Sequence, residues 1–218
     1  MKVFRLAGFL VAALALVPFS HADGGPVNMV FTGVNGANDG TYYVSPYTGT
    51  MNGGSVVLFC DDIKNEISIG EQWQANVTNL GTAINTNNFT DTRYGGVRGS
   101  GVYSNPTVAY EEAAWLVTQF AGNSADLVSL QYALWDIMNP NSEPTSYGDV
   151  QTWLDRAEQN YGSIDPYNFA IVTNTGTLQL TGQEQEFIIE TPEPGVIALL
   201  LCGLLALAVL MNRHRLTA

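Results

Sequence analysis

Two residues of this chain have side chains that could react with each other, Cys60 and Gln131. Cys60 ends the apolar run 55–60, whose composition is typical of a strand covered on both faces. Gln131 lies on the apolar stripe of a predicted helix over about 125–138, four residues after Leu127. We therefore expect the glutamine to be buried, where an amide without a partner costs about 1 to 3 kcal/mol.

A cysteine thiolate can attack a side-chain carboxamide and expel ammonia, which leaves an intramolecular thioester. That single bond would remove the free thiol of Cys60 and the buried amide of Gln131, and it would store an electrophile. The alternative is purely structural: Cys60 is an inert core residue and Gln131 donates to a backbone carbonyl.

The remaining chemistry-bearing residue types are scarce. Both histidines, His21 and His214, lie outside residues 23–193, which excludes a Cys-His or Ser-His nucleophile pair there. The second cysteine, Cys202, lies within an apolar C-terminal run, so we expect no bridge between it and Cys60. Without Cys/His ligand sets we predict no zinc site, no other metal and no cofactor.

Acidic residues dominate the same segment. All 20 Asp and Glu lie within 23–193, against Lys64, Arg93, Arg98 and Arg156, so nucleic acid is an unfavourable partner. Adjacent Glu111 and Glu112 on a predicted helix should diverge rather than act as an acid/base pair. The pair 61–62 could supply a base that assists thioester formation, or could cap the strand or be solvated. A glycosidase that uses two carboxylates stays open.

Short motifs around both reactive residues resemble the signatures of thioester domains in Gram-positive surface adhesins: an aromatic-Cys motif at 58–60 and a Gln-x-Ala-aliphatic-Trp motif at 130–135. The resemblance implies that Cys60 and Gln131 form the bonded pair and that Phe59 and Trp135 shield the bond from water. It implies a single-use covalent attachment to an amine or hydroxyl of a surface target, polysaccharide or protein, and not a turnover enzyme. A passive matrix or glycan-binding surface protein is the alternative.

The N-terminus has the pattern of a secretory signal peptide over 1–22. Lys2 and Arg5 precede an apolar stretch, and a small-x-small site ends at Ala22. At the other end, an uncharged apolar run over 195–211 has the length of a short transmembrane helix, and Arg213 and Arg215 follow it. Those arginines should hold the C-terminus on the cytoplasmic side.

Pro192, Glu193 and Pro194 stand immediately before that run. The order of Pro-Glu-Pro, one apolar helix and a basic tail resembles the PEP-CTERM sorting signal of Gram-negative bacteria, over residues 192–218. The resemblance implies an exported precursor anchored transiently in the inner membrane. An exosortase-type protease would process it, and the product would reach the cell surface or an extracellular matrix.

Between the two signals, residues 23–191 are long enough for one extracytoplasmic domain. Strands are predicted at 27–34, 41–44, 55–60, 168–173, 177–180 and 186–191, with helices from Asn105 as N-cap to about 121, over 125–138 after Ser124 as cap, and over 150–161. Residues 63–104 read as short strands and an exposed loop. Strands on both sides of a helical segment predict an α+β fold, with a β-rich sheet or barrel-like part and an inserted helical segment.

Overall fold

A computed structural model describes residues 25–95, 105–140, 147–176, 184–191 and 203–204. The predicted signal peptide, the Pro-Glu-Pro motif and the apolar run 195–211 lie outside these ranges, apart from Gly203 and Leu204, which are helical. Among the described residues no helix combines the length and the apolar character needed to cross a membrane. Residues His21–Thr191 form one compact unit.

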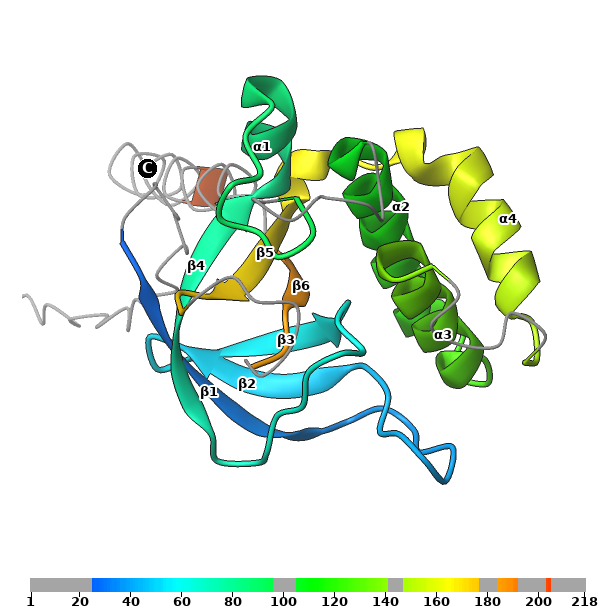
Figure 1. The fold of residues 1–218 in the computed structure, drawn as a ribbon, viewed down its shortest axis with the longest axis horizontal. Coiled ribbons are helices and arrows are strands. Elements are labelled where there is room, and N and C mark those ends of the chain that lie inside the picture. Colours follow the sequence, from blue (N-terminus) through cyan, green and yellow to red (C-terminus); the bar gives the residue numbers. More distant parts are fainter. Residues whose placement is uncertain (1–24, 96–104, 141–146, 177–183, 192–202, 205–218) are drawn as a thin grey trace, which may run out of the picture. The chain divides into compact units, whose positions relative to one another are not determined.

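Six antiparallel strands close into a barrel (Figure 1). Around the barrel the order is β1, β2, β3, β6, β5 and β4, and pairing of β1 with β4 closes it. The strands are β1 (Val27–Val34), β2 (Tyr47–Met51), β3 (Gly54–Cys60), β4 (Gln72–Asn79), β5 (Phe169–Asn174) and β6 (Phe187–Glu190). The predicted barrel-like β part is confirmed.

Four α-helices accompany the barrel: α1 (Leu80–Thr86), α2 (Pro106–Gln119), α3 (Leu127–Met138) and α4 (Val150–Asn160). Helices α2, α3 and α4 pack against one another beside the barrel, whereas α1 sits on the end of β4 (Figure 1). All four lie between β4 and β5 in the sequence. The prediction of a mixed fold with a helical segment inserted between strands is therefore confirmed.

Alternation of buried and exposed side chains explains why residues Val27–Val34 form strand β1. Val27, Met29 and Phe31 are buried, and the intervening Asn28 is exposed. The β2–β3 hairpin is closed by Asn52 and Gly53, which both have positive φ (50° and 83°), as a two-residue Asn-Gly turn requires. Both features depend on residues that are close together in the sequence; β1 was predicted from them, and the β2–β3 hairpin was not.

Helix α2 begins as predicted. The Asn105 side chain accepts a hydrogen bond from the Thr107 amide, and Pro106 occupies the first turn. Helix α3 differs from the prediction at its start: it begins at Leu127, and its N-cap is Asp126, without a side-chain capping bond, rather than Ser124. Nine of the twelve α3 residues are buried, because the helix lies between the barrel, α2 and α4.

Several predicted elements are wrong. Residues 41–44 form no regular strand; they contribute one isolated bridge, between Asn38 and Tyr43, and the strand begins at Tyr47. Within residues 63–104, where short strands and a loop were expected, β4 is such a strand, but Leu80–Thr86 form the helix α1, which was not predicted. Strand β3 is not covered on both faces throughout, since Val57 is 50% exposed. The strand predicted at 177–180 lies outside the described residues.

Candidate functional site

Cys60 is completely buried at the last position of β3. Its cross-strand partner is Phe187 on β6, and directly opposed residues of an antiparallel pair project to the same face. The Phe187 ring stacks on Phe31 and meets the edge of Tyr47, in the aromatic centre of the barrel. The cysteine therefore lies at the rim of the barrel core, a place from which water is excluded.

The Gln131 carboxamide reaches this rim from α3. Its side-chain nitrogen donates to the Cys60 carbonyl oxygen at 2.6 Å, and its side-chain oxygen accepts from the Ser45 amide at 2.9 Å. Gln131 is fully buried, as the helical spacing predicted. Two residues separated by 71 positions in the sequence are thus brought into direct contact.

Ser45 binds both partners, and no sequence pattern indicated it. Its amide donates to Gln131, and its hydroxyl oxygen accepts from the Cys60 amide at 2.9 Å. Within the loop before β2, the backbone of Gly36 packs closely against the backbone of Val44 and Ser45. A Cβ added at Gly36 would lie 1.9 Å from the Val44 carbonyl oxygen. Only glycine permits that approach, so Gly36 helps to set the position of Ser45.

The backbone after β3 wraps around the cysteine sulfur. The Cys60 thiol donates to the Asp62 carbonyl oxygen at 3.3 Å, and the Asp62 amide donates back to the sulfur at 3.4 Å. Burial, together with the negative charges of Asp62 and Asp61, raises the pKa of the thiol well above its usual value; the Trp135 side chain and the Asp62 amide oppose this rise. A free Cys60 is consequently held as a neutral thiol.

The two predicted shielding residues are both buried but occupy different places. Trp135, 2% exposed, lies one turn after Gln131 on α3 and close enough to Cys60 to act on its pKa. The exposed Tyr42 ring packs edge-on against it, with centroids 5.5 Å apart. Phe59 precedes Cys60 and turns to the opposite face of β3, where its ring meets Phe120 edge-on at 5.1 Å. Trp135 therefore lies near the Cys60 sulfur, whereas Phe59 lies on the other face of β3, against Phe120.

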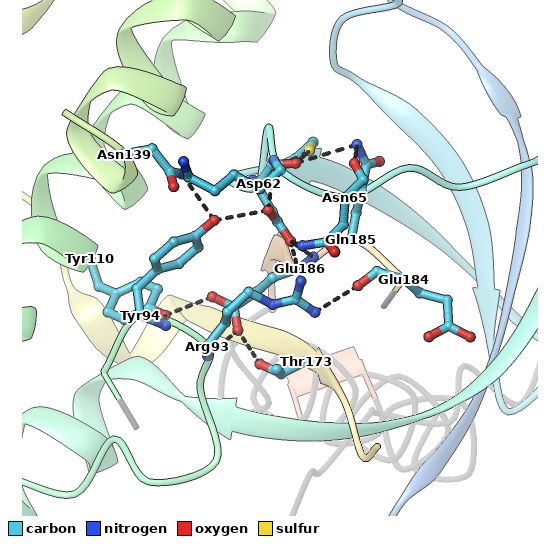
Figure 2. Close-up of polar contacts among 12 residues, drawn as sticks. Asp62, Asn65, Arg93, Tyr94, Tyr110, Asn139, Thr173, Glu184, Gln185 and Glu186 are labelled. Atoms are coloured by element: carbon cyan, nitrogen blue, oxygen red, sulfur yellow. Dashed lines mark hydrogen bonds and ion pairs between the residues drawn. The ribbon is translucent and has the colours of Figure 1, made fainter. Parts of the chain in front are cut away.

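A buried polar network borders the cysteine, and the sequence did not reveal it (Figure 2). Asp62 and Arg93 form an ion pair at 2.5 Å, with side chains 0% and 1% exposed. The same Asp62 carboxylate accepts from Asn65 at 2.7 Å and from the Tyr94 hydroxyl at 2.9 Å. Arg93 also donates to the Glu184 carbonyl oxygen at 2.7 Å, so its guanidinium joins Asp62 to the segment before β6.

Glu186 is the second carboxylate of the network. It accepts from the Arg93 amide at 2.6 Å, from the Tyr110 hydroxyl at 2.7 Å and from the Thr173 hydroxyl. The third is Asp61, also completely buried, and neither of its oxygens has a hydrogen-bond partner among the residues that the structure describes. Burial, and then the charges of Glu186 and Asp62, raise the pKa of Asp61 well above its usual range.

The adjacent acidic residues Glu111 and Glu112 on α2 do not belong to this site. Glu112 on α2 is partly buried, and burial followed by the charge of Glu158 on α4 raises its pKa to about 7. Burial also raises the pKa of Glu111. The effect on Glu112 thus comes from its own desolvation and from another helix, and not from a shared proton with its neighbour.

Within the described part of the chain, no group of three or more His, Cys, Asp or Glu side chains has an arrangement that could hold a metal ion. Comparisons with protein-family models, with curated proteins and with solved structures each find no match for this chain.

Proposed function

We propose that this protein is an exported surface or extracellular-matrix protein that attaches covalently to a target nucleophile through a thioester between Cys60 and Gln131. The contact between the two residues carries the proposal. The Gln131 carboxamide is buried against the backbone of Cys60, 2.6 Å from its carbonyl oxygen, and the sequence separates the two by 71 positions. A reactive pair must be assembled by the fold before any bond can form.

The surroundings suit acyl transfer from nitrogen to sulfur. Attack of the Cys60 sulfur on the Gln131 side-chain carbonyl forms the carbon–sulfur bond, breaks the carbon–nitrogen bond, and releases ammonia as the thiol proton passes to nitrogen. The Ser45 amide donates to the carbonyl oxygen on which negative charge would develop. A preorganised donor at that position lowers the barrier, as in an oxyanion hole.

Protection from water supports the same proposal. Cys60 and Gln131 are 0% exposed, and Trp135 is 2% exposed. A thioester there would resist hydrolysis until a target displaced the aromatic cover. The exposed Tyr42 ring packs on Trp135 from the loop before β2, so this loop and α3 form the side from which an amine or hydroxyl would approach.

A passive matrix or glycan-binding protein is the second candidate, and one observation favours it. Both polar atoms of the Gln131 amide already have hydrogen-bond partners, Ser45 and Cys60, so burial of the glutamine needs no covalent bond. In that case Cys60 and Gln131 join the barrel to α3 by hydrogen bonds alone.

Export and sorting belong to the proposal through the two chain ends. The signal-peptide pattern over 1–22 supports export, and the Pro-Glu-Pro motif with its apolar run and basic tail supports processing by an exosortase-type protease. The inner membrane would hold the precursor transiently before release to the surface.

Coupling of a biotinylated primary amine to the purified full-length chain tests the function. We expect one biotin per chain, located at Gln131 by peptide mapping, with a new thiol at Cys60. Cys60→Ala and Gln131→Ala should each abolish the coupling. The matched controls Cys202→Ala and Gln119→Ala should couple like the parent chain. Coupling that survives either site substitution would refute the assignment of the pair.

A further inference from the structure

A polar pocket lies between strand β4, helix α1 and the loop that follows α1 (Figure 1 shows these elements). Its volume is about 440 Å³, within the range of small-molecule sites. We propose that this pocket binds a neutral saccharide unit. The inference does not depend on the thioester, because Cys60, Gln131 and Ser45 do not line the pocket.

The lining of the pocket offers both hydrogen-bond donors and acceptors. Its polar side chains are amides, hydroxyls and one carboxylate: Asn76, Thr78, Thr82, Thr86, Asn88 and Asp91. Within the described part of the chain, the side chains of Asn76, Thr82 and Asp91 make no hydrogen bond to another residue. The Asn88 side-chain oxygen accepts from the amide and the hydroxyl of Thr90, so its nitrogen is left to donate. These groups can therefore bind a ligand.

The backbone around the pocket is held by hydrogen bonds of its own. The side-chain oxygen of Asn79 caps α1 by accepting from the Thr82 amide at 3.0 Å, and its nitrogen donates to the Tyr167 carbonyl oxygen at 2.9 Å. After α1, the Asn88 amide donates to the Ala83 carbonyl oxygen at 2.9 Å. The polar groups are thus positioned before a ligand arrives, which lowers the entropic cost of binding.

Charge selects against an anionic ligand. Among the described residues that line the pocket there is no Lys, Arg or His, and Asp91 contributes a negative charge. The segment 23–193 carries all 20 Asp and Glu of the chain, so its field repels phosphates and acidic polysaccharides. Asp91 is also the only carboxylate among these lining residues, whereas a calcium site uses several oxygen ligands that include carboxylates. A neutral ligand fits this electrostatic environment best.

The apolar part of the lining is small. Val77 and Ala83 supply it, and no aromatic ring lines the pocket among the described residues. An aliphatic or aromatic ligand would cover the amides and hydroxyls without giving them partners, which is unfavourable. A saccharide ring carries several hydroxyl groups, each of which donates one hydrogen bond and accepts others. Bonds from two such hydroxyls to the Asp91 carboxylate would be charge-assisted and the strongest of the set.

Ligand-observed NMR by saturation transfer tests the site on the full-length chain, held in a detergent without sugar groups. The probes are glucose, galactose and mannose, with glucuronate and galacturonate as the charged counterparts. We expect a saturable signal for at least one neutral hexose and a much weaker one for its uronate. Asp91→Ala should weaken binding about tenfold and Thr82→Val about fivefold, as loss of a charged and of a neutral hydrogen bond predicts.

The controls separate the site from the fold and from the thioester. Thr82 and Asp91 are exposed, so both variants should unfold in urea like the parent chain. The matched substitutions Thr152→Val and Asp155→Ala, at exposed positions of α4, should bind like the parent. Cys60→Ala, which cannot form a thioester, should also bind like the parent.

Three results would overturn the saccharide site. The first is a panel in which no neutral hexose gives a saturable signal. The second is a uronate that binds as tightly as its neutral hexose. The third is hexose binding that is unchanged in both Asp91→Ala and Thr82→Val. Each of these outcomes leaves the proposed thioester untouched, because that bond is measured by mass and by amine coupling at Gln131.

Discussion

Opening the Cys60–Gln131 bond should destabilise the domain without any change of sequence. The bond would close a loop across the 71 positions that separate the two residues, from β3 through α1 and α2 to α3. For a cross-link of that span the chain-entropy relation gives about 4 kcal/mol of stabilisation, because the bond restricts the unfolded chain. Ammonia is the suitable reagent, since its product is the native glutamine and leaves no added atom in a fully buried site.

Urea unfolding measures this effect. The full-length chain held in ammonia should unfold at a lower urea concentration than the chain without it, by the equivalent of about 4 kcal/mol. Cys60→Ala, which cannot form the bond, is the control for the effect of ammonia itself and should show no such shift. A mass gain of one ammonia without loss of stability would refute the entropy argument. Equal masses and equal stabilities would refute the bond.

Three further outcomes are expected. Arg93→Met should lower the free energy of unfolding in urea by about 3 to 5 kcal/mol, because it leaves the buried Asp62 without its ion-pair partner. Arg156→Met should lower it little. The pKa of Glu112 is about 7 in the folded protein, whereas its ordinary value is 4.5, so the free energy of unfolding should fall as pH rises between these values. Glu112→Gln should remove this fall, which is worth about 1 kcal/mol after solvent screening. In the native host, peptide mapping should find surface material that begins near Asp23 and lacks 195–211.

The sequence predicted those parts of the fold that depend on near neighbours. Strand β1 follows from alternation over eight residues, and the start of α2 follows from Asn105 and Pro106. Burial of Gln131 followed from helical spacing in the same way. Helix α1 was missed because its seven residues carry few strong helix formers and are held by packing against β4, β5 and the turn before β5.

The candidate site was predictable only in part, for a related reason. Cys60 and Gln131 could be chosen as chemical anomalies, but Ser45 joins them through a backbone amide that has no sequence signature. The Asp62–Arg93 pair spans 31 positions and the Arg93–Glu186 contact spans 93. Such contacts arise from barrel closure, because β6 pairs with β3 only after the whole helical segment has folded back.

The most direct test of the central claim is a peptide map of the purified full-length chain, digested under mildly acidic conditions that spare thioesters. We predict one linked species, joining the peptide that contains Cys60 to the peptide that contains Gln131 and lighter than their sum by one ammonia. In the same sample Cys60 should resist alkylation after denaturation, while Cys202 is alkylated. Two separate peptides at their sequence masses, with Cys60 fully alkylated on unfolding, would contradict the claim.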